Sequence, residues 1–163
     1  ALSEIFSIPT RVMHAADAIS RWIRNEIKKP LLIGPDAESE QWVAAVARDA
    51  EAPYLTLQKL RHGDADVEVS VPNVTSWRGH TPVLVDDIIS TGHTMIETIG
   101  HLRRAGLPPP VCIGVHGIFA ANALDALISS GAARIVTVNT IPHSTNEIDI
   151  MPTLAEALDS LAS

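Results

Sequence analysis

The segment VLVDDIISTGHT, residues 83–94, joins an apolar run to two adjacent aspartates and a cluster of hydroxyl side chains. Its first three residues predict a buried parallel strand, and the apolar spacing of residues 95–105 predicts a helix that stops at Gly106. The residues between them therefore connect the carboxyl end of a strand to the amino end of a helix. Backbone N–H groups are unpaired there and the helix dipole is positive, which favours phosphate binding. We therefore interpret residues 86–94 as a phosphosugar site.

The polar residues of this segment fall into two chemical sets. Asp86 and Asp87 can accept hydrogen bonds from two neighbouring sugar hydroxyls, or hold a hydrated Mg²⁺. The second set can hold a phosphate through main chain and hydroxyl groups, and consists of Ser90, Thr91, Gly92, His93 and Thr94. The alternative is an ordinary strand, turn and helix in which these residues only cap the helix. A cap needs one such residue, so their concentration favours a ligand site.

Outside this segment, predicted helices and strands alternate along the chain. Helices are expected at 14–29, 38–50, 94–105, about 121–130 and 153–162, and strands at 31–34, 54–57, 67–71, 82–86, 111–116 and 134–138. Such alternation is typical of a mostly parallel sheet with helices on both faces. We therefore predict a doubly wound α/β fold in a single domain that spans residues 1–163.

Composition excludes several classes of function. The chain has 163 residues, with 12 Lys and Arg against 19 Asp and Glu, so its net charge of -7 argues against a nucleic-acid surface. No apolar run is long enough to cross a membrane, which makes the cytoplasm the default expectation. The one cysteine, Cys112, lies in the apolar run VCIGV and is expected in the core rather than as a nucleophile.

The seven histidines show no metal-binding spacing. We expect His14, His80 and His101 to be surface or helix residues. His93, His116 and His143 differ, because they fall in the phosphate loop or just after a predicted strand. That is the edge where ligands bind in open α/β sheets.

The pattern of two aspartates followed by Thr-Gly-x-Thr resembles the phosphoribosyl-diphosphate loop of type I phosphoribosyltransferases and of ribose-phosphate pyrophosphokinases. Four further segments are similar to those of the pyrophosphokinases and in the same order: Gly34-Pro35-Asp36, Lys59-x-Arg61, VHGIF at 115–119 and VTVNTIP at 136–142. The resemblance covers nearly the whole chain but only the second of two tandem halves in that family. We therefore expect an amino-terminal, ATP-binding half before residue 1.

The resemblance implies diphosphoryl transfer from ATP to ribose 5-phosphate in a homo-oligomeric enzyme that uses Mg²⁺. Asp36 would be a metal ligand. Residues 58–66, QKLRHGDAD, would be a flexible catalytic loop in which Lys59 and Arg61 close over the polyphosphate. Cations brought in by such closure stabilise the charge that gathers on the phosphates. From composition alone, a solvated hairpin connection is the alternative for this stretch.

Two other functions stay open at this point. One is a phosphoribosyltransferase that transfers ribosyl phosphate to a base, although the sequence shows no base-binding hood. The other is a non-catalytic regulatory homologue that binds phosphosugar. Its support comes from departures from the family pattern at Ser90, His93, Glu38 and Ser39.

Overall fold

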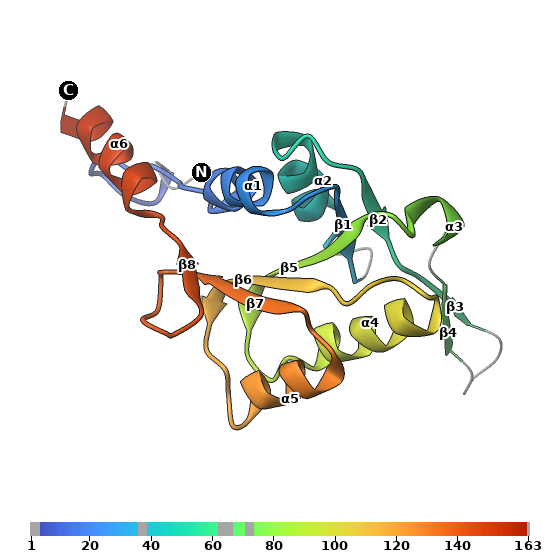
Figure 1. The fold of residues 1–163 in the computed structure, drawn as a ribbon. Coiled ribbons are helices and arrows are strands. Elements are labelled where there is room, and N and C mark those ends of the chain that lie inside the picture. Colours follow the sequence, from blue (N-terminus) through green and yellow to red (C-terminus); the bar gives the residue numbers. More distant parts are fainter. Residues whose placement is uncertain (1–3, 36–38, 62–66, 71–73, 163) are drawn as a thin grey trace.

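The computed structural model describes residues 4–35, 39–61, 67–70 and 74–162. Its centre is a six-stranded sheet in the order β2-β1-β5-β6-β7-β8, in which every neighbouring pair is parallel (Figure 1). The strands are β1 Pro30–Gly34, β2 Tyr54–Thr56, β5 Thr81–Ile89, β6 Val111–Gly117, β7 Arg134–Val138 and β8 Asn146–Ile148. The helices are α1 Ala16–Glu26, α2 Glu40–Asp49, α3 Val74–Trp77, α4 His93–Arg104, α5 Ala123–Ser130 and α6 Met151–Ala162. The predicted doubly wound fold is confirmed.

Alternating residues of each strand enter separate cores on the two faces of the sheet. Leu32 of β1 packs in the core beneath α1 and α2, whereas its neighbours Leu31 and Ile33 pack in the core beneath α4 and α5. All three are fully buried, and each such side chain contributes about 1.5–3 kcal/mol relative to exposure. The strands read as continuous apolar runs because a parallel sheet is covered on both faces.

The chain reverses its direction of growth across the sheet between β1 and β5. After β1 it crosses over on one face through α2 to β2, and after β5 it crosses on the other face through α4 to β6. The loops that leave the carboxyl ends of β1 and β5 therefore diverge, and open sheets bind ligands in the crevice between such loops. Residues 86–94 lie at this crevice.

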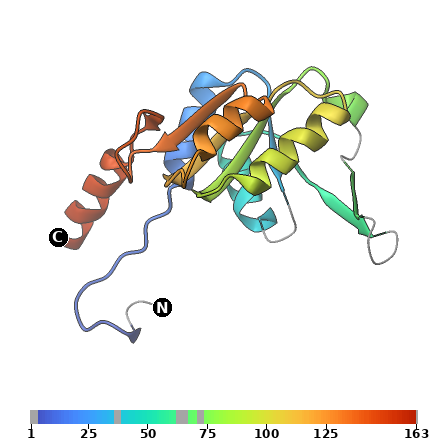
Figure 2. The ribbon, with the colours of Figure 1, turned by 90° about the horizontal axis from the view of Figure 1, so that it is seen from below.

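Part of the predicted loop at 58–66 is a strand. Gln58–Arg61 forms β3, which pairs antiparallel with β4, Val67–Ser70, and Figure 2 shows this hairpin projecting beyond the sheet. The other predicted loop residues, 62–66, lie outside the described residues. Composition did not indicate β3 because QKLR holds one apolar residue and no β-branched one.

Two other elements were not predicted, because each is very short. The helix α3 has four residues, and β8 has three, of which only Ile148 is apolar. The position of β8 depends on contacts from outside it. The side-chain amide of Asn146 donates to Thr137 Oγ1 at 2.8 Å and to the carbonyl of Val138 at 3.2 Å.

The last helix, α6, projects from the body, and the amino-terminal residues 4–13 run along the same side (Figure 2). Arg11 donates a hydrogen bond to Ser160 between the two. The apolar side chains of α6 at Met151, Leu154, Leu158 and Leu161 are all exposed. In the described part of the chain, no helix has the length and apolar character needed to cross a membrane.

Cys112 lies in β6, near the middle of the sheet, and is fully buried. Burial disfavours the thiolate and raises the pKa of Cys112 to about 12. The expectation of a core cysteine is confirmed. This environment disfavours a nucleophilic role, because the thiolate is the reactive form.

Candidate functional site

The strand β5 ends at Ile89 and α4 begins at His93, so three residues make the turn between them. The turn is tight because Gly92 adopts the left-handed conformation, with φ of 72°. A Cβ atom at this position would also lie 3.2 Å from Cγ and Cδ1 of Leu127 in α5, so the turn rests on that helix. Glycine is therefore favoured here by its conformation, and a larger residue would also have to displace the Leu127 side chain slightly.

The residues of this loop surround a cavity of about 190 Å³. It is lined by Asp86, Ile88, Ile89, Ser90, Thr91, Gly92, His93, Thr94 and Met95. Every residue predicted for the phosphate set therefore lies at one cavity, together with Asp86. Asp87 is exposed beside it, and its backbone N–H donates to Asp86 Oδ1 at 2.9 Å.

The phosphate side of the cavity is formed by the amino end of α4. The backbone N–H of Ile96 donates to the carbonyl of Gly92 at 2.9 Å, which is the first bond of the helix. The preceding N–H groups, of His93, Thr94 and Met95, have no partner within the helix. The N-cap residue also has no side chain that could accept a hydrogen bond from them, because it is glycine. Together with the helix dipole, these donors are suited to bind an anion.

The carboxylate side provides oxygen acceptors. Asp86 is half-buried and Asp87 is exposed, and ionised carboxylates only accept hydrogen bonds. A vicinal diol fits such a pair, and so does a hydrated Mg²⁺ that takes its other ligands from water and substrate phosphates. Among the described residues, no group of three or more His, Cys, Asp and Glu converges.

The loop after β6 forms backbone hydrogen bonds with the start of the phosphate loop, and the sequence did not reveal this contact. The backbone N–H groups of Ile118 and Phe119 both donate to the carbonyl of Ile89 at 3.0 Å. The N–H of Ala120 donates to the carbonyl of Ser90 at 3.0 Å. The only available signal was the VHGIF segment, whose contribution depends on backbone geometry that a pattern of residue types does not encode.

The three histidines expected at this edge lie there in different surroundings. His93 is exposed and lines the cavity. His116 Nδ1 lies 2.9 Å from Thr140 Oγ1, and that hydroxyl donates its proton to the carbonyl of Val115 at 2.7 Å. Since Thr140 can then only accept from the ring, His116 carries a proton on Nδ1. His143 packs against the ring of Phe119, with ring centroids 4.5 Å apart.

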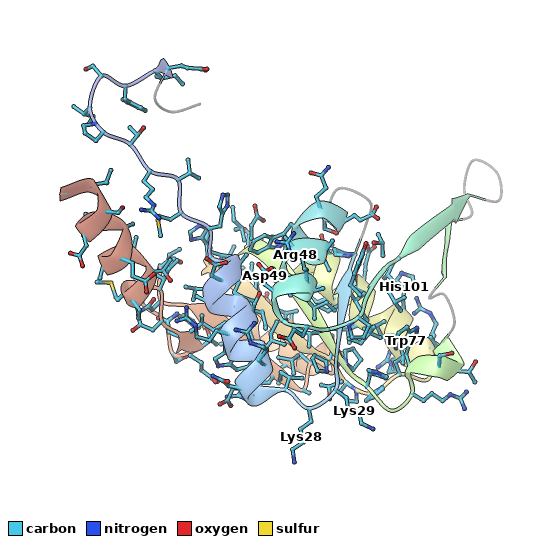
Figure 3. The ribbon with its side chains drawn as sticks, turned by 90° about the horizontal axis from the view of Figure 1, so that it is seen from above. Lys28, Lys29, Arg48, Asp49, Trp77 and His101 are labelled. Carbon is cyan, nitrogen blue, oxygen red and sulfur yellow. The ribbon has the colours of Figure 1, made fainter. Side chains whose placement is uncertain are left out.

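The opposite edge of the sheet holds side chains without a part in this site. Lys28 and Lys29 precede β1 and extend away from the body, as Figure 3 shows. His101 accepts a hydrogen bond at 2.6 Å from Arg104 in the last turn of α4, whereas the cavity lies at the first turn of that helix. His80 packs against Trp77 with ring centroids 4.9 Å apart. The expectation of a helix position is confirmed for His101, whereas His80 lies after α3, half-buried, with its Nδ1 buried and without a hydrogen-bond partner.

The roles of all the predicted site residues stay predictions, and for three of them the structure does not describe the side chain. Asp36 lies outside the described residues, although its neighbour Pro35 lines a small cavity of about 10 Å³ with Asp86. The backbone of Lys59 pairs with Val69, and that of Arg61 with Val67, in the β3–β4 hairpin. Of the family departures, Glu38 lies outside the described residues and Ser39 precedes α2 as its N-cap.

A second cavity, of about 160 Å³, lies beside β8 and has a structural explanation. Its carboxylate Asp149 accepts a hydrogen bond at 2.9 Å from the backbone N–H of Met151, and another at 2.8 Å from Asn139. These two bonds, the first being the stronger cause, lower the pKa of Asp149. Asp149 therefore serves to begin α6, whereas Asn146 and Glu147 form hydrogen bonds with residues of β7.

Comparison with known proteins identifies relatives along nearly the whole chain. Residues 1–152 match the phosphoribosyl transferase domain family. The ribose-phosphate pyrophosphokinase of Methanopyrus kandleri is 31% identical over 159 residues, which are 96% of this chain and 54% of that relative. The chain thus spans about half the length of the curated relatives it matches.

Two solved structures share the fold. The phosphoribosylpyrophosphate synthetase from Mycobacterium smegmatis has a TM-score of 0.77 and 23% identity, over 98% of this chain and 54% of the other. The orotate phosphoribosyltransferase from Aeropyrum pernix has a TM-score of 0.54 and 18% identity, over 87% of this chain and 75% of the other.

Proposed function

The chain belongs to the phosphoribosyl transferase domain family, and from this membership we propose that it is the ribose 5-phosphate-binding half of a ribose-phosphate pyrophosphokinase. One observation carries the proposal. At the switch point of the sheet, an uncapped helix amino terminus and the carboxylate of Asp86 meet at one cavity, and Asp87 is exposed beside it. A phosphate needs the first and a ribose diol needs the second. Similarity to pyrophosphokinases along nearly the whole chain favours this reaction over transfer of ribosyl phosphate to a base.

In the proposed complex, the 5-phosphate accepts hydrogen bonds from the backbone N–H groups of His93, Thr94 and Met95. The hydroxyls of Ser90 and Thr91 add further donors at the same cavity. The ribose hydroxyls donate to Asp86 and Asp87. Such contacts fix the sugar at both ends, so that its C1 hydroxyl is held in one orientation for attack.

The proposed reaction is attack of the C1 hydroxyl oxygen on the β-phosphorus of ATP. A bond forms between that oxygen and the β-phosphorus, the bond from the β-phosphorus to the oxygen on the α-phosphorus breaks, and AMP leaves as the C1 hydroxyl loses its proton. Lys59 and Arg61 are proposed to neutralise charge on the phosphates. Mg²⁺, with Asp36 as a proposed ligand, would supply further neutralisation on the polyphosphate. ATP itself is proposed to bind chiefly outside these 163 residues.

Titration calorimetry with ribose 5-phosphate tests the proposal. Asp87→Asn keeps the shape of the side chain but removes its charge, and we expect affinity to fall about 10- to 100-fold, as for loss of a hydrogen bond to a charged group. Asp125→Asn, which makes the same change at an exposed position in the first turn of α5, is the matched control and should bind normally. Equal affinity of the Asp87→Asn and wild-type proteins would remove the role of the carboxylate in sugar binding.

Inorganic phosphate and ribose, titrated separately, divide the site into its two halves. Phosphate should bind equally to the wild type and to Asp87→Asn, because its partners are backbone N–H groups. If wild-type protein produces no heat with ribose 5-phosphate at millimolar concentration, the proposed function is wrong.

A further inference from the structure

The loop that follows β6 holds the start of the phosphate loop in place through its main chain. Three backbone N–H groups, those of Ile118, Phe119 and Ala120, donate to the carbonyls of Ile89 and Ser90 at 3.0 Å each. Ile89 and Ser90 both line the cavity, whereas Phe119 does not. The position of the cavity wall therefore depends on the conformation of a loop outside it.

That conformation is one that its residues do not favour. Phe119 has a φ of 47° and Ala121 a φ of 55°, both in the left-handed region that side chains with a Cβ atom avoid. Residues held in such a conformation persist only where the surrounding structure enforces it, and they concentrate at functional sites. The contacts of the Phe119 ring provide this enforcement.

The Phe119 ring is held from two sides. It lies over Gly117, where an added Cβ would come within 2.7 Å of ring atom Cε2 and 2.8 Å of Thr137 Cγ2. It also packs against the His143 ring at 4.5 Å, with 32° between the planes. His143 is itself fixed, because its Nδ1 accepts from the backbone N–H of Thr145 at 3.3 Å and lies 2.9 Å from the hydroxyl of that residue.

We propose that Phe119, stacked on His143 and seated on Gly117, is a positioning residue that fixes the main chain of the phosphate loop and thereby sets its affinity for the sugar phosphate. This inference rests on the proposed function for its ligand. It adds that the conformation of the loop between β7 and β8, which carries His143, is coupled to that of the phosphate loop. The hydrogen bond from His116, near the end of β6, to Thr140 ties the loop between β7 and β8 to β6 at a second point.

The first readout is the affinity for ribose 5-phosphate, measured where every variant is fully folded, so that a loss of global stability does not change it. Phe119→Ala and His143→Ala should each weaken binding about three- to tenfold, as for the loss of an aromatic pair. His143→Phe keeps a ring for the stack and should restore most of the affinity. Ile118→Ala is the matched control, since this neighbouring side chain is 53% exposed and its backbone N–H is retained.

The second readout needs no ligand. Hydrogen exchange of the amides of Ile118, Phe119 and Ala120, followed by NMR, reports the three bonds to the phosphate loop directly. Exchange should quicken in Phe119→Ala and His143→Ala by a factor similar to the loss of affinity, and should be unchanged in Ile118→Ala.

The two readouts separate the inference from the proposed function. If the wild type does not bind ribose 5-phosphate, the proposed function fails, and faster exchange in the two ring variants still supports the coupling of the loops. Unchanged exchange, or unchanged affinity where the wild type binds, overturns the inference. If Phe119→Ala does not fold, His143→Ala decides the matter, because its ring lies in a partly exposed loop.

Discussion

Alanine substitutions at three glycines can separate two costs at the phosphate turn, that of a left-handed backbone conformation and that of steric crowding. Gly92 combines a left-handed φ of 72° with a Cβ position 3.2 Å from Leu127. Gly106 has a left-handed φ of 78° but nothing within 4 Å of its Cβ position, and Gly79 has neither constraint. Alanine at the three positions therefore tests conformation and crowding separately.

The expected losses of unfolding free energy follow from these geometries. For Gly79→Ala, the free energy of unfolding should stay unchanged or rise by up to about 1 kcal/mol. Gly106→Ala should lose about 1–2 kcal/mol through its backbone conformation. Gly92→Ala should lose about 2–5 kcal/mol, because displacement of the buried Leu127 side chain is added to the same conformational cost. For a chain of this length, each kcal/mol lowers Tm by about 2–4 °C.

Urea unfolding followed by circular dichroism gives these free energies, and calorimetry with ribose 5-phosphate gives the functional effect. Only Gly92→Ala should lose ligand affinity, since only this glycine precedes the N–H groups proposed to hold the phosphate. Trimming Leu127 to alanine in the Gly92→Ala background should recover the crowding part of the loss in a double-mutant cycle. Equal destabilisation by Gly92→Ala and Gly106→Ala would refute the argument from crowding.

Three further predictions concern other parts of the molecule. Gly100→Ala, in the interior of α4, should stabilise the protein by about 0.5–1 kcal/mol in urea unfolding, since the new Cβ meets only the flexible end of Arg104 at 3.4 Å. Because the folded pKa of Asp149 is lowered from its usual 3.8, its stabilising effect should be present above about pH 4 and vanish as the pH falls through the folded pKa. Asp149→Asn should therefore be less stable than wild type at neutral pH and equally stable in strong acid; a constant difference across that range would contradict the assignment. The 163-residue chain, incubated with ribose 5-phosphate, ATP and Mg²⁺, should release no AMP, because it spans only about half the length of its relatives. Turnover at about 10 s⁻¹ would show instead that these 163 residues suffice for the reaction.

Much of the sheet could be predicted because its strands carry strong local signals. Val83 to Val85 are consecutive apolar residues, which is typical of a strand buried on both faces of a sheet. The types of the residues that follow them predict a turn and then a helix. The residues 86–94 could be assigned to one site for the same reason, since a parallel strand and its following helix fix where their connection lies.

The remaining features depend on contacts between distant segments. The strand β8 is held by the Asn146 side chain bonded to β7, and β3 by its pairing with β4. The support from Phe119 needs a left-handed backbone and a ring packed across to His143. A pattern of residue types along the chain contains no information on such angles and distances.

The single thiol at the centre of the sheet can be used to measure transient local opening of the core. Cys112 is sealed on both sides and its pKa is raised to about 12, so an alkylating reagent can react only during an opening that separates β6 from its neighbours. Its labelling rate therefore measures the free energy of that opening without an added probe. Above the usual thiol pKa of about 9, ionisation favours the opened form, so the core should loosen progressively with alkali and labelling should quicken beyond the chemistry of the thiolate alone.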